Sequence, residues 1–255
     1  MKNILITGGA GYIGSNLAEL LINKGFSVFI IDNLKTGFKK LIHKKSHFFE
    51  IDLRQQEKIK KLLKFYNVDT VIHLAALLDV NESQKKPTKY FQNNVQGTKN
   101  LLSACLNSSV KNFIFSSTAA VYKDGIYKVN ENSPLRPKSN YGKGKLLAEK
   151  IIKSKLKRKI NYVILRYFNV CGASKSNKFG QINSYDLLFK NLAKSVLKKN
   201  PSINIYGSDY KTKDKTCIRD FIHVSDLADI HLKILKNLNK LKKPQILNCS
   251  YGSGK

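Results

Sequence analysis

Long apolar runs and regularly spaced cysteines are both missing from the sequence. No run of about eighteen apolar residues occurs, so we expect no helix that crosses a membrane. The start, MKNILITGG, has one lysine and too short an apolar run for a signal peptide. The four cysteines, Cys105, Cys171, Cys217 and Cys249, lack the spacing of a metal site. These absences favour a cytoplasmic protein with reduced thiols and with neither a metal nor a membrane partner.

Acidic residues and arginine are also scarce. The chain has 46 Lys and Arg against 17 Asp and Glu, a formal net charge of +29. Such a charge can serve nucleic-acid binding, but the lysines are spread along the whole chain. No arginine-rich segment or aromatic RNA-binding signature occurs. We interpret the charge as solvated surface and expect no specific nucleic-acid partner, because a dedicated site should cluster its charge.

The first part of the chain alternates short apolar segments with amphipathic ones, which predict strands and helices respectively. Strands that alternate with helices indicate an α/β fold, here a Rossmann-like doubly wound parallel sheet with helices on both faces. The predicted strands are 2–7, 27–32, 47–53, 69–76, 111–117 and 161–168. The predicted helices are 12–25, 55–67, 87–108 and one that opens at Tyr141.

From about Cys171 the sequence becomes more polar and irregular. Two further helices are predicted, over 187–199 and over 224–238, the second with Ser225 as its N-cap. Residues 202–207 predict a strand. We expect residues 1–170 to form the sheet domain. The remainder, 171–255, is expected to form a smaller and incomplete lobe, with sheet elements recurring near 217–224.

A glycine-rich turn separates the first predicted strand from the first predicted helix. In ITGGAGYIG, Gly9, Gly11 and Gly14 satisfy G-x-G-x-x-G, and Gly8, Gly11 and Gly14 satisfy G-x-x-G-x-x-G. Glycines let the backbone turn tightly and approach a pyrophosphate that rests on the helix N-terminus. Asp32 ends the second predicted strand, where a carboxylate bonds a ribose diol and repels a 2′-phosphate. The strand, the helix and the acid together favour an NAD site over a structural glycine turn.

Residues 1–170 are therefore predicted to be an NAD-binding domain. Asp52 ends the third predicted strand and could contact the adenine or only cap its strand, and the sequence does not decide between these roles.

SNYGKGK places Tyr141 and Lys145 four residues apart, on one face of a helix. A free tyrosine has a pKa of about 10 and is a poor base at neutral pH. A neighbouring cation favours the phenolate and lowers that pKa, so the pair predicts a base. A Tyr-x-x-x-Lys pair often arises by chance, and it gains weight here from the NAD site in the same chain.

Together these motifs resemble the extended short-chain dehydrogenases/reductases, in their NAD-dependent epimerase/dehydratase group, and especially the UDP-glucose 4-epimerases. The resemblance covers the whole chain. Its segments are TGGAGYIGSN, IDNL, DTVIHLAA, VNESQKKP, NNVQGT, KNFIFSSTAAVY, YGKGK, LRYFNVCGA and GSDYKTKDKTCIRDFIHVSDLAD. The last segment is the most specific for the epimerases, whereas the glycine and Tyr–Lys motifs indicate only the superfamily.

The resemblance implies roles for individual residues. Tyr141 is the acid/base, Lys145 bonds the nicotinamide ribose and holds the phenolate, and Thr118 bonds the reacting sugar oxygen. Asn169 and Arg219 contact the diphosphate of the sugar nucleotide, since a guanidinium meets phosphate oxygens bidentately. The substrate-binding set is thus Thr118, Tyr141, Asn169 and Arg219. The cofactor-binding set is Gly8, Gly11, Tyr12, Ile13, Gly14, Asp32, Asn33, Asp52, Leu53, Leu74, Ala75, Asn93, Ser116, Tyr141, Lys145 and Phe168.

The implied reaction interconverts UDP-glucose and UDP-galactose by transient oxidation at C4. Tyr141 takes the proton of the 4-hydroxyl while hydride passes to NAD, and the 4-ketosugar turns before hydride returns on its other face. The family usually pairs through two helices of the sheet layer, here 87–108 and 142–156, so we expect a homodimer.

The chain departs from the family pattern at several positions. Leu78 stands where some epimerases carry lysine, Lys123 replaces the usual glycine after VY, and Gly144 replaces a serine. Asp186 and Leu187 fall where the family often places an asparagine that binds the nucleotide. Family members also continue past the end of this sequence, so we expect a C-terminally truncated chain whose turnover is in doubt.

Other functions remain open. A 4-epimerase of UDP-N-acetylhexosamines, or another nucleotide-sugar enzyme, would differ in pocket size. A 4,6-dehydratase fits less well, because Ala119 and Ala120 stand where that group has an acidic pair. A non-catalytic NAD-binding or RNA-binding relative would not need the acid/base set. Arg219 could instead form a salt bridge with Asp220.

Overall fold

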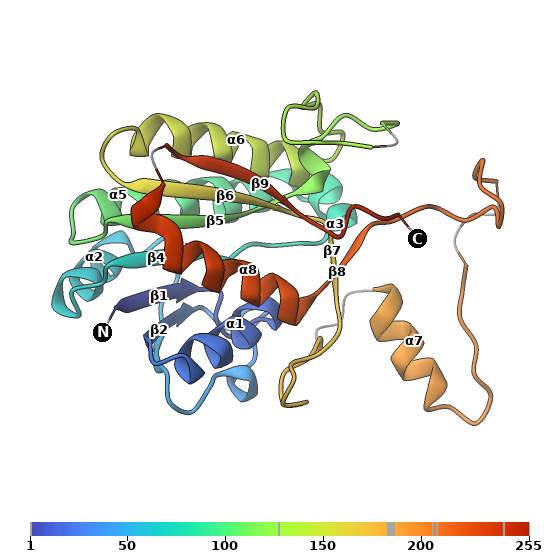
Figure 1. The fold of residues 1–255 in the computed structure, drawn as a ribbon, viewed down its shortest axis with the longest axis horizontal. Coiled ribbons are helices and arrows are strands. Elements are labelled where there is room, and N and C mark those ends of the chain that lie inside the picture. The colour runs from blue at the N-terminus through green and yellow to red at the C-terminus, as the bar shows by residue number, and fades with distance from the viewer. Residues whose placement is uncertain are drawn as a thin grey trace.

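The computed structural model describes residues 2–126, 128–182, 187–205, 207, 209–241 and 243–254. Within these ranges a seven-stranded parallel sheet has the strand order β3-β2-β1-β4-β5-β6-β9, and helices cover both of its faces (Figure 1). The predicted Rossmann-like α/β fold is therefore confirmed. The strands are β1 (Asn3–Thr7), β2 (Ser27–Asp32), β3 (His47–Glu50), β4 (Thr70–His73), β5 (Asn112–Thr118), β6 (Asn161–Tyr167) and β9 (Gln245–Cys249). The covering helices are α1 (Tyr12–Asn23), α2 (Gln56–Phe65), α5 (Gly97–Leu106), α6 (Asn140–Leu156) and α8 (Val224–Asn237).

Successive side chains of a strand point to opposite faces of the sheet. Because helices cover both faces, the side chains on both sides are buried. Along β1, Leu5 packs in the layer that contains α2, α5 and α6, while Ile4 and Ile6 pack in the layer that contains α1 and α8. All three side chains are fully buried. Successive apolar residues in the middle of β1 therefore stabilise the sheet from both sides.

The strand order reverses at β1. The chain runs outward from β1 through β2 to β3, and then returns to pair β4 with the opposite side of β1. Loops diverge at such a reversal, and open parallel sheets bind ligands there, at the carboxyl ends of their strands. Gly8, Asp32, Leu74, Ser116 and Phe168 lie at or just after the carboxyl ends of β1, β2, β4, β5 and β6.

The helix predicted over residues 87–108 is interrupted. It consists of α4 (Pro87–Tyr90), a π-helical turn η2 (Phe91–Gln96) and α5. A π turn adds one residue to the helix and often marks a functional site. Apolar spacing alone gave no sign of this turn, which contains both Asn93 and Asn94.

Two local predictions are wrong. Residues 202–205 form no strand, because no neighbouring strand pairs with them in the described part of the chain. Ser225 is not the N-cap of α8, because the helix begins at Val224 and the ring of His223 accepts the Ser225 N–H at 3.2 Å. An imidazole nitrogen thus takes the capping role that we assigned to a hydroxyl.

Part of the chain after residue 170 joins the sheet layer. β9 pairs with β6, and α8 packs in the same apolar layer as α1. Two short strands, β7 (Asn169–Cys171) and β8 (Phe221–His223), form a separate parallel pair. α7 (Leu188–Val196) stands away from the sheet (Figure 1). The division into domains at residue 170 stays a prediction, and the segment assigned to the second domain supplies one strand and one helix of the first layer.

The described helices include none with the length and apolar character needed to cross a bilayer.

The short helix α3 (Val80–Lys85) follows β4 and packs beside α6.

A buried hydrogen bond joins α8 to β6. His231 is fully buried, with Nδ1 2.8 Å from the Leu227 carbonyl oxygen and Nε2 2.8 Å from the Tyr167 hydroxyl. Because a carbonyl only accepts, Nδ1 carries the proton and Tyr167 donates to Nε2. Burial lowers the pKa of His231 from 6.5 to about 4.

This pKa predicts an acid-dependent loss of stability. Between about pH 6.5 and pH 4 the unfolded chain binds a proton that folded His231 does not, so the free energy of unfolding falls as the pH falls, by up to roughly 3 kcal/mol. His73, whose pKa is lowered to about 3 by burial, contributes in the same direction. His231→Gln should be less stable near neutral pH yet have a shallower slope in urea titrations over this range. Equal slopes in the variant and the parent would contradict the assignment.

Candidate functional site

A cavity of about 1200 Å³ opens at the carboxyl edge of the sheet, above the usual range of about 300–1000 Å³ for sites that hold one small ligand. The structure brings nearly all predicted site residues to its wall. Those that line it are Gly8, Gly11, Tyr12, Ile13, Gly14, Asp32, Asn33, Leu53, Leu74, Ala75, Asn93, Ser116, Thr118, Tyr141, Lys145, Phe168, Asn169 and Arg219. Asp52 is not among them.

The glycine turn leaves no room for side chains. Gly8 has φ +73°, and a Cβ there would lie 2.7 Å from the Ala75 nitrogen. A Cβ on Gly14 would overlap the Gly8 oxygen and lie 2.7 Å from the Gly9 Cα. α1 begins directly after Gly11, which has no side chain to cap the helix. The unblocked N-terminus of α1 therefore fits a dinucleotide pyrophosphate.

Asp32 lies at the end of β2 and is 8% exposed. One carboxylate oxygen accepts the Ala10 N–H at 3.1 Å, and the other accepts the Leu34 N–H at 2.9 Å. Burial raises the pKa of Asp32, and these backbone hydrogen bonds oppose the rise. Each oxygen keeps acceptor capacity for a further donor, as a ribose diol requires.

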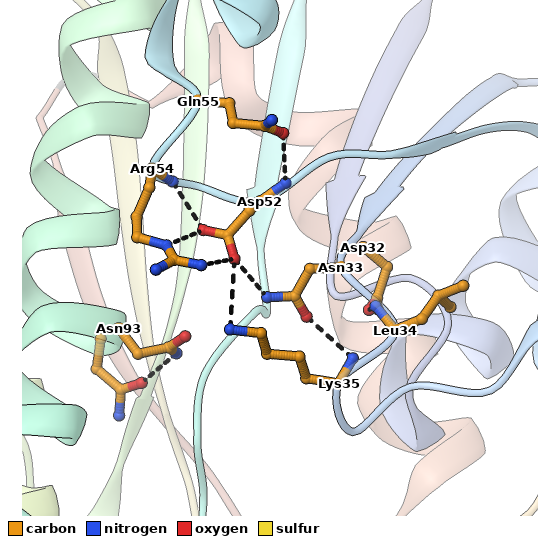
Figure 2. A network of polar contacts seen from close by, with 9 residues as sticks. Asp32, Asn33, Leu34, Lys35, Asp52, Arg54, Gln55 and Asn93 are labelled. Carbon is orange, nitrogen blue, oxygen red and sulfur yellow. Dashed lines mark hydrogen bonds and ion pairs between the residues drawn. The ribbon is translucent and has the colours of Figure 1, made fainter.

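Asp52 belongs to a polar network beside the cavity (Figure 2). Arg54 bonds both carboxylate oxygens, at 2.8 and 2.9 Å, and Asn33 donates to one of them at 2.9 Å. The hydrogen bonds from Arg54 lower the pKa of Asp52 well below its usual range. The carboxylate thus fixes the loop that presents Asn33 and Leu53 to the cavity, and its contact with adenine stays a prediction.

Lys145 is buried beneath the cavity wall. Its ammonium donates to the Ser116 carbonyl oxygen at 2.7 Å and lies 4.9 Å from the centre of the Phe115 ring. Burial lowers the pKa of Lys145 to about 7, and the charge of Glu149 opposes this lowering. Tyr141 lines the same cavity one turn earlier on α6.

The start of α6 is fixed by several hydrogen bonds. Ser139 caps the helix by accepting the Gly142 N–H at 3.0 Å, and the Tyr141 N–H donates to the Ser83 hydroxyl at 3.2 Å. Thr118, at the end of β5, accepts the Ala120 N–H at 3.1 Å. These bonds hold the backbone of the predicted acid/base and sugar-binding residues at one wall of the cavity.

Arg219 and Asp220 do not form the salt bridge that we considered. The Asp220 carboxylate instead accepts the backbone N–H groups of Tyr251 and Gly252, at 3.1 and 2.9 Å. Its backbone carbonyl accepts the Asn169 side-chain amide at 2.8 Å. Asp220 therefore ties β8 to the turn after β9, and the Arg219 guanidinium lines the cavity.

Two residues of the cavity region, Asn94 and Tyr167, were not predicted from the sequence. Asn94 holds Leu77 by both backbone groups, at 2.8 and 2.9 Å, and so fixes the loop after β4. Tyr167 lines the cavity and is anchored by His231. For Asn94, the pair of adjacent asparagines, Asn93 and Asn94, within an otherwise helical segment was the one sequence feature that could have indicated this role. Of the departures from the family pattern, Leu78 and Leu187 line the cavity, and Asp186 lies outside the described residues.

The strand order, the glycine turn before α1 and the acid after β2 define a Rossmann-type dinucleotide-binding protein. Residues 4–250 match the model of the NAD dependent epimerase/dehydratase family. The chain belongs to this family, as its motifs predicted.

Several relatives and solved structures are similar along the whole chain. A UDP-glucose 4-epimerase of Lactobacillus helveticus is 40% identical over 256 residues, which cover 98% of this chain and 77% of the relative. The solved UDP-glucose 4-epimerase of Brucella ovis, in complex with NAD, has a TM-score of 0.94 and 35% identity, over 100% of this chain and 79% of that one. The UDP-Glc/GlcNAc 4-epimerase of Campylobacter jejuni has a TM-score of 0.84 and 38% identity, with 100% and 80% covered.

The packing around Gly14 predicts a selective loss of NAD binding. Gly14→Ala forces a methyl group against the Gly8 backbone, so NAD affinity should fall about tenfold or more. Gly144→Ala is the matched control, because its Cβ would lie 3.6 Å from Val95 Cγ2, an ordinary contact. Calorimetric titration of each variant with NAD measures the difference in affinity. Equal affinities would show that the turn does not hold the pyrophosphate.

Proposed function

We propose that this protein is an NAD-dependent 4-epimerase that interconverts UDP-glucose and UDP-galactose. The observation that carries the proposal is the shared cavity: Tyr141, Lys145 and Thr118 line the same cavity as the glycine turn and Asp32. A protein that only stored NAD would not need a tyrosine and a buried lysine on one helix face. The names and NAD complexes of the similar proteins described above support the same activity.

The residues fit NAD and divide its binding between two ends of the cavity. The glycine turn and the α1 N-terminus would hold the pyrophosphate, and Asp32 would bond the adenine ribose. Lys145 would bond the nicotinamide ribose at the other end. When bound, NAD supplies a hydride acceptor and donor for sugar C4.

The chain itself supplies orientation and proton transfer. Tyr141 Oη accepts the proton of the sugar 4-hydroxyl and later returns it, while the Lys145 ammonium stabilises the phenolate form. Thr118 orients the 4-oxygen by a hydrogen bond. Arg219 and Asn169 hold the diphosphate firmly. The hexose can therefore rotate and present either face of C4 to the nicotinamide without leaving the site.

A second candidate substrate is a UDP-N-acetylhexosamine. The cavity volume and the likeness to the Campylobacter jejuni enzyme, whose name includes both kinds of sugar, support it. Incubation with UDP-galactose and with UDP-N-acetylgalactosamine in parallel, followed by chromatography of the sugars, separates the two candidates.

We also propose a cytoplasmic homodimer. Phe91 and Leu147 are apolar and exposed, at 47% and 39%, on η2 and α6, which contact each other. These helices correspond to the two segments that the resemblance assigned to pairing. All four cysteines are free, as expected in a reducing compartment. Sedimentation of the chain tests the pairing.

Tyr141→Phe should abolish epimerisation while NAD remains bound. The phenyl ring keeps the shape of the wall but loses the proton-transfer group, so turnover should fall by about 10²–10⁴-fold. Tyr66→Phe, on a tyrosine that packs against Phe29 far from the cavity wall, is the control and should keep full turnover. Normal epimerisation by Tyr141→Phe would rule out the acid/base assignment.

Arg219→Gln should weaken binding of the sugar nucleotide and leave NAD affinity unchanged. Loss of a charged hydrogen-bond donor costs about 1.5–3 kcal/mol, so KM for UDP-galactose should rise roughly 10–100-fold. Arg136→Gln removes an arginine outside the cavity and should leave KM unchanged. Unaltered KM in Arg219→Gln, or a matching loss of NAD affinity, would remove Arg219 from the diphosphate site.

A further inference from the structure

A buried ion pair lies beneath the Tyr–Lys wall and has no part in the function proposed above. The side chains of Glu149 on α6 and Arg166 on β6 are 0% and 1% exposed. Arg166 donates to both carboxylate oxygens, at 3.0 and 2.8 Å. The Ser117 hydroxyl donates to one of the same oxygens at 2.6 Å. Removing two charges from water is costly, and buried pairs often add little net stability, so this pair suggests a role besides folding.

The pair is connected to the site on both sides. Glu149 follows Lys145 by four residues on α6, so the two side chains share a helix face. Ser117 stands on β5 between Ser116, whose carbonyl binds the Lys145 ammonium, and Thr118. One carboxylate is thus bonded to the strand end that carries both the ammonium's acceptor and the predicted sugar-binding hydroxyl.

The groups around Lys145 come from four elements. On α6, Tyr141 and Glu149 lie one turn before and one turn after Lys145. On β6, Arg166 binds Glu149, and Tyr167 lines the same cavity as Lys145. β5 contributes the Ser116 carbonyl and the Phe115 ring, which carry no net charge. β4 contributes His73, which is neutral because burial lowers its pKa to about 3.

Glu149 is therefore the carboxylate in this group of side chains. Burial works against the ammonium form of Lys145, and the charge of Glu149 favours it. Arg166 binds the carboxylate bidentately, which holds that negative charge ionised and in a fixed place.

We propose that Glu149 is a positioning residue for the Tyr–Lys pair: its carboxylate favours the cationic form of Lys145 from the next turn of α6 and holds the end of β5 in place through Ser117. The inference rests on the proposed function, because the charge of Lys145 matters through the phenolate that it stabilises. Arg166 serves by fixing the carboxylate. The Tyr–Lys motif thus extends one further turn, as Tyr-x-x-x-Lys-x-x-x-Glu.

The test measures the protonation of Lys145 in the ligand-free chain. Carbon-13 NMR of labelled lysine Cε follows its titration, and the resonance is assigned by its loss in Lys145→Met. Glu149→Gln should lower the midpoint of Lys145 by about one pH unit, since removal of a nearby opposite charge disfavours the ammonium. Glu57→Gln, an exposed carboxylate on α2, is the matched control and should leave it unchanged.

Glu149→Gln leaves Arg166 buried without its partner and could fail to fold. The double variant Glu149→Gln/Arg166→Gln leaves no unpaired buried charge. Because it also removes the Arg166 cation, it should lower the midpoint by less than Glu149→Gln does. A midpoint at or above that of the parent chain, in whichever of these two variants folds, would overturn the proposal. The titration needs no turnover, so a failure of the proposed function appears as missing sugar product, and a failure of this inference appears as an unmoved midpoint.

Discussion

The arrangement of the site depends on one ammonium group held inside the protein. Lys145 is bonded to the Ser116 carbonyl, lies over the Phe115 ring and faces Glu149 within α6. Burial disfavours the charged form of this lysine, and a neutral amine could not favour a phenolate. The surrounding polar groups are therefore part of the chemistry as well as of the packing.

The sheet topology supplies the geometry for that chemistry. Reversal of the strand order at β1 brings the loops after β1, β2 and β4 together at the edge where α6 lies against β5. A dinucleotide bound along this edge would have its adenosine beside Asp32, its pyrophosphate in the middle at the α1 N-terminus, and its nicotinamide beside Lys145 and Tyr141. The fold thus fixes the direction of a dinucleotide before any side chain is considered.

Much of this could be predicted from the sequence, because the signals were local. Strand and helix periodicity gave the sheet, and short motifs gave the glycine turn, Asp32 and the Tyr–Lys pair. The contacts that escaped prediction join residues far apart in the chain. Arg166 with Glu149, His231 with Tyr167, and Asp220 with the turn after β9 meet only once the strands are assembled. The packing of α8 against α1 and the pairing of β9 with β6 also join distant residues, and no local pattern shows which layer an apolar helix face will join.

The π turn within residues 91–96 sets the rotational phase between α4 and α5. Each residue of a helix corresponds to about 100° of rotation, so one residue more or fewer would turn the preceding segment away from its neighbours. Asn94 and Thr98, four residues apart, anchor Leu77 and His73 from opposite sides of this phase boundary. This stretch should therefore tolerate changes of residue type far better than changes of length.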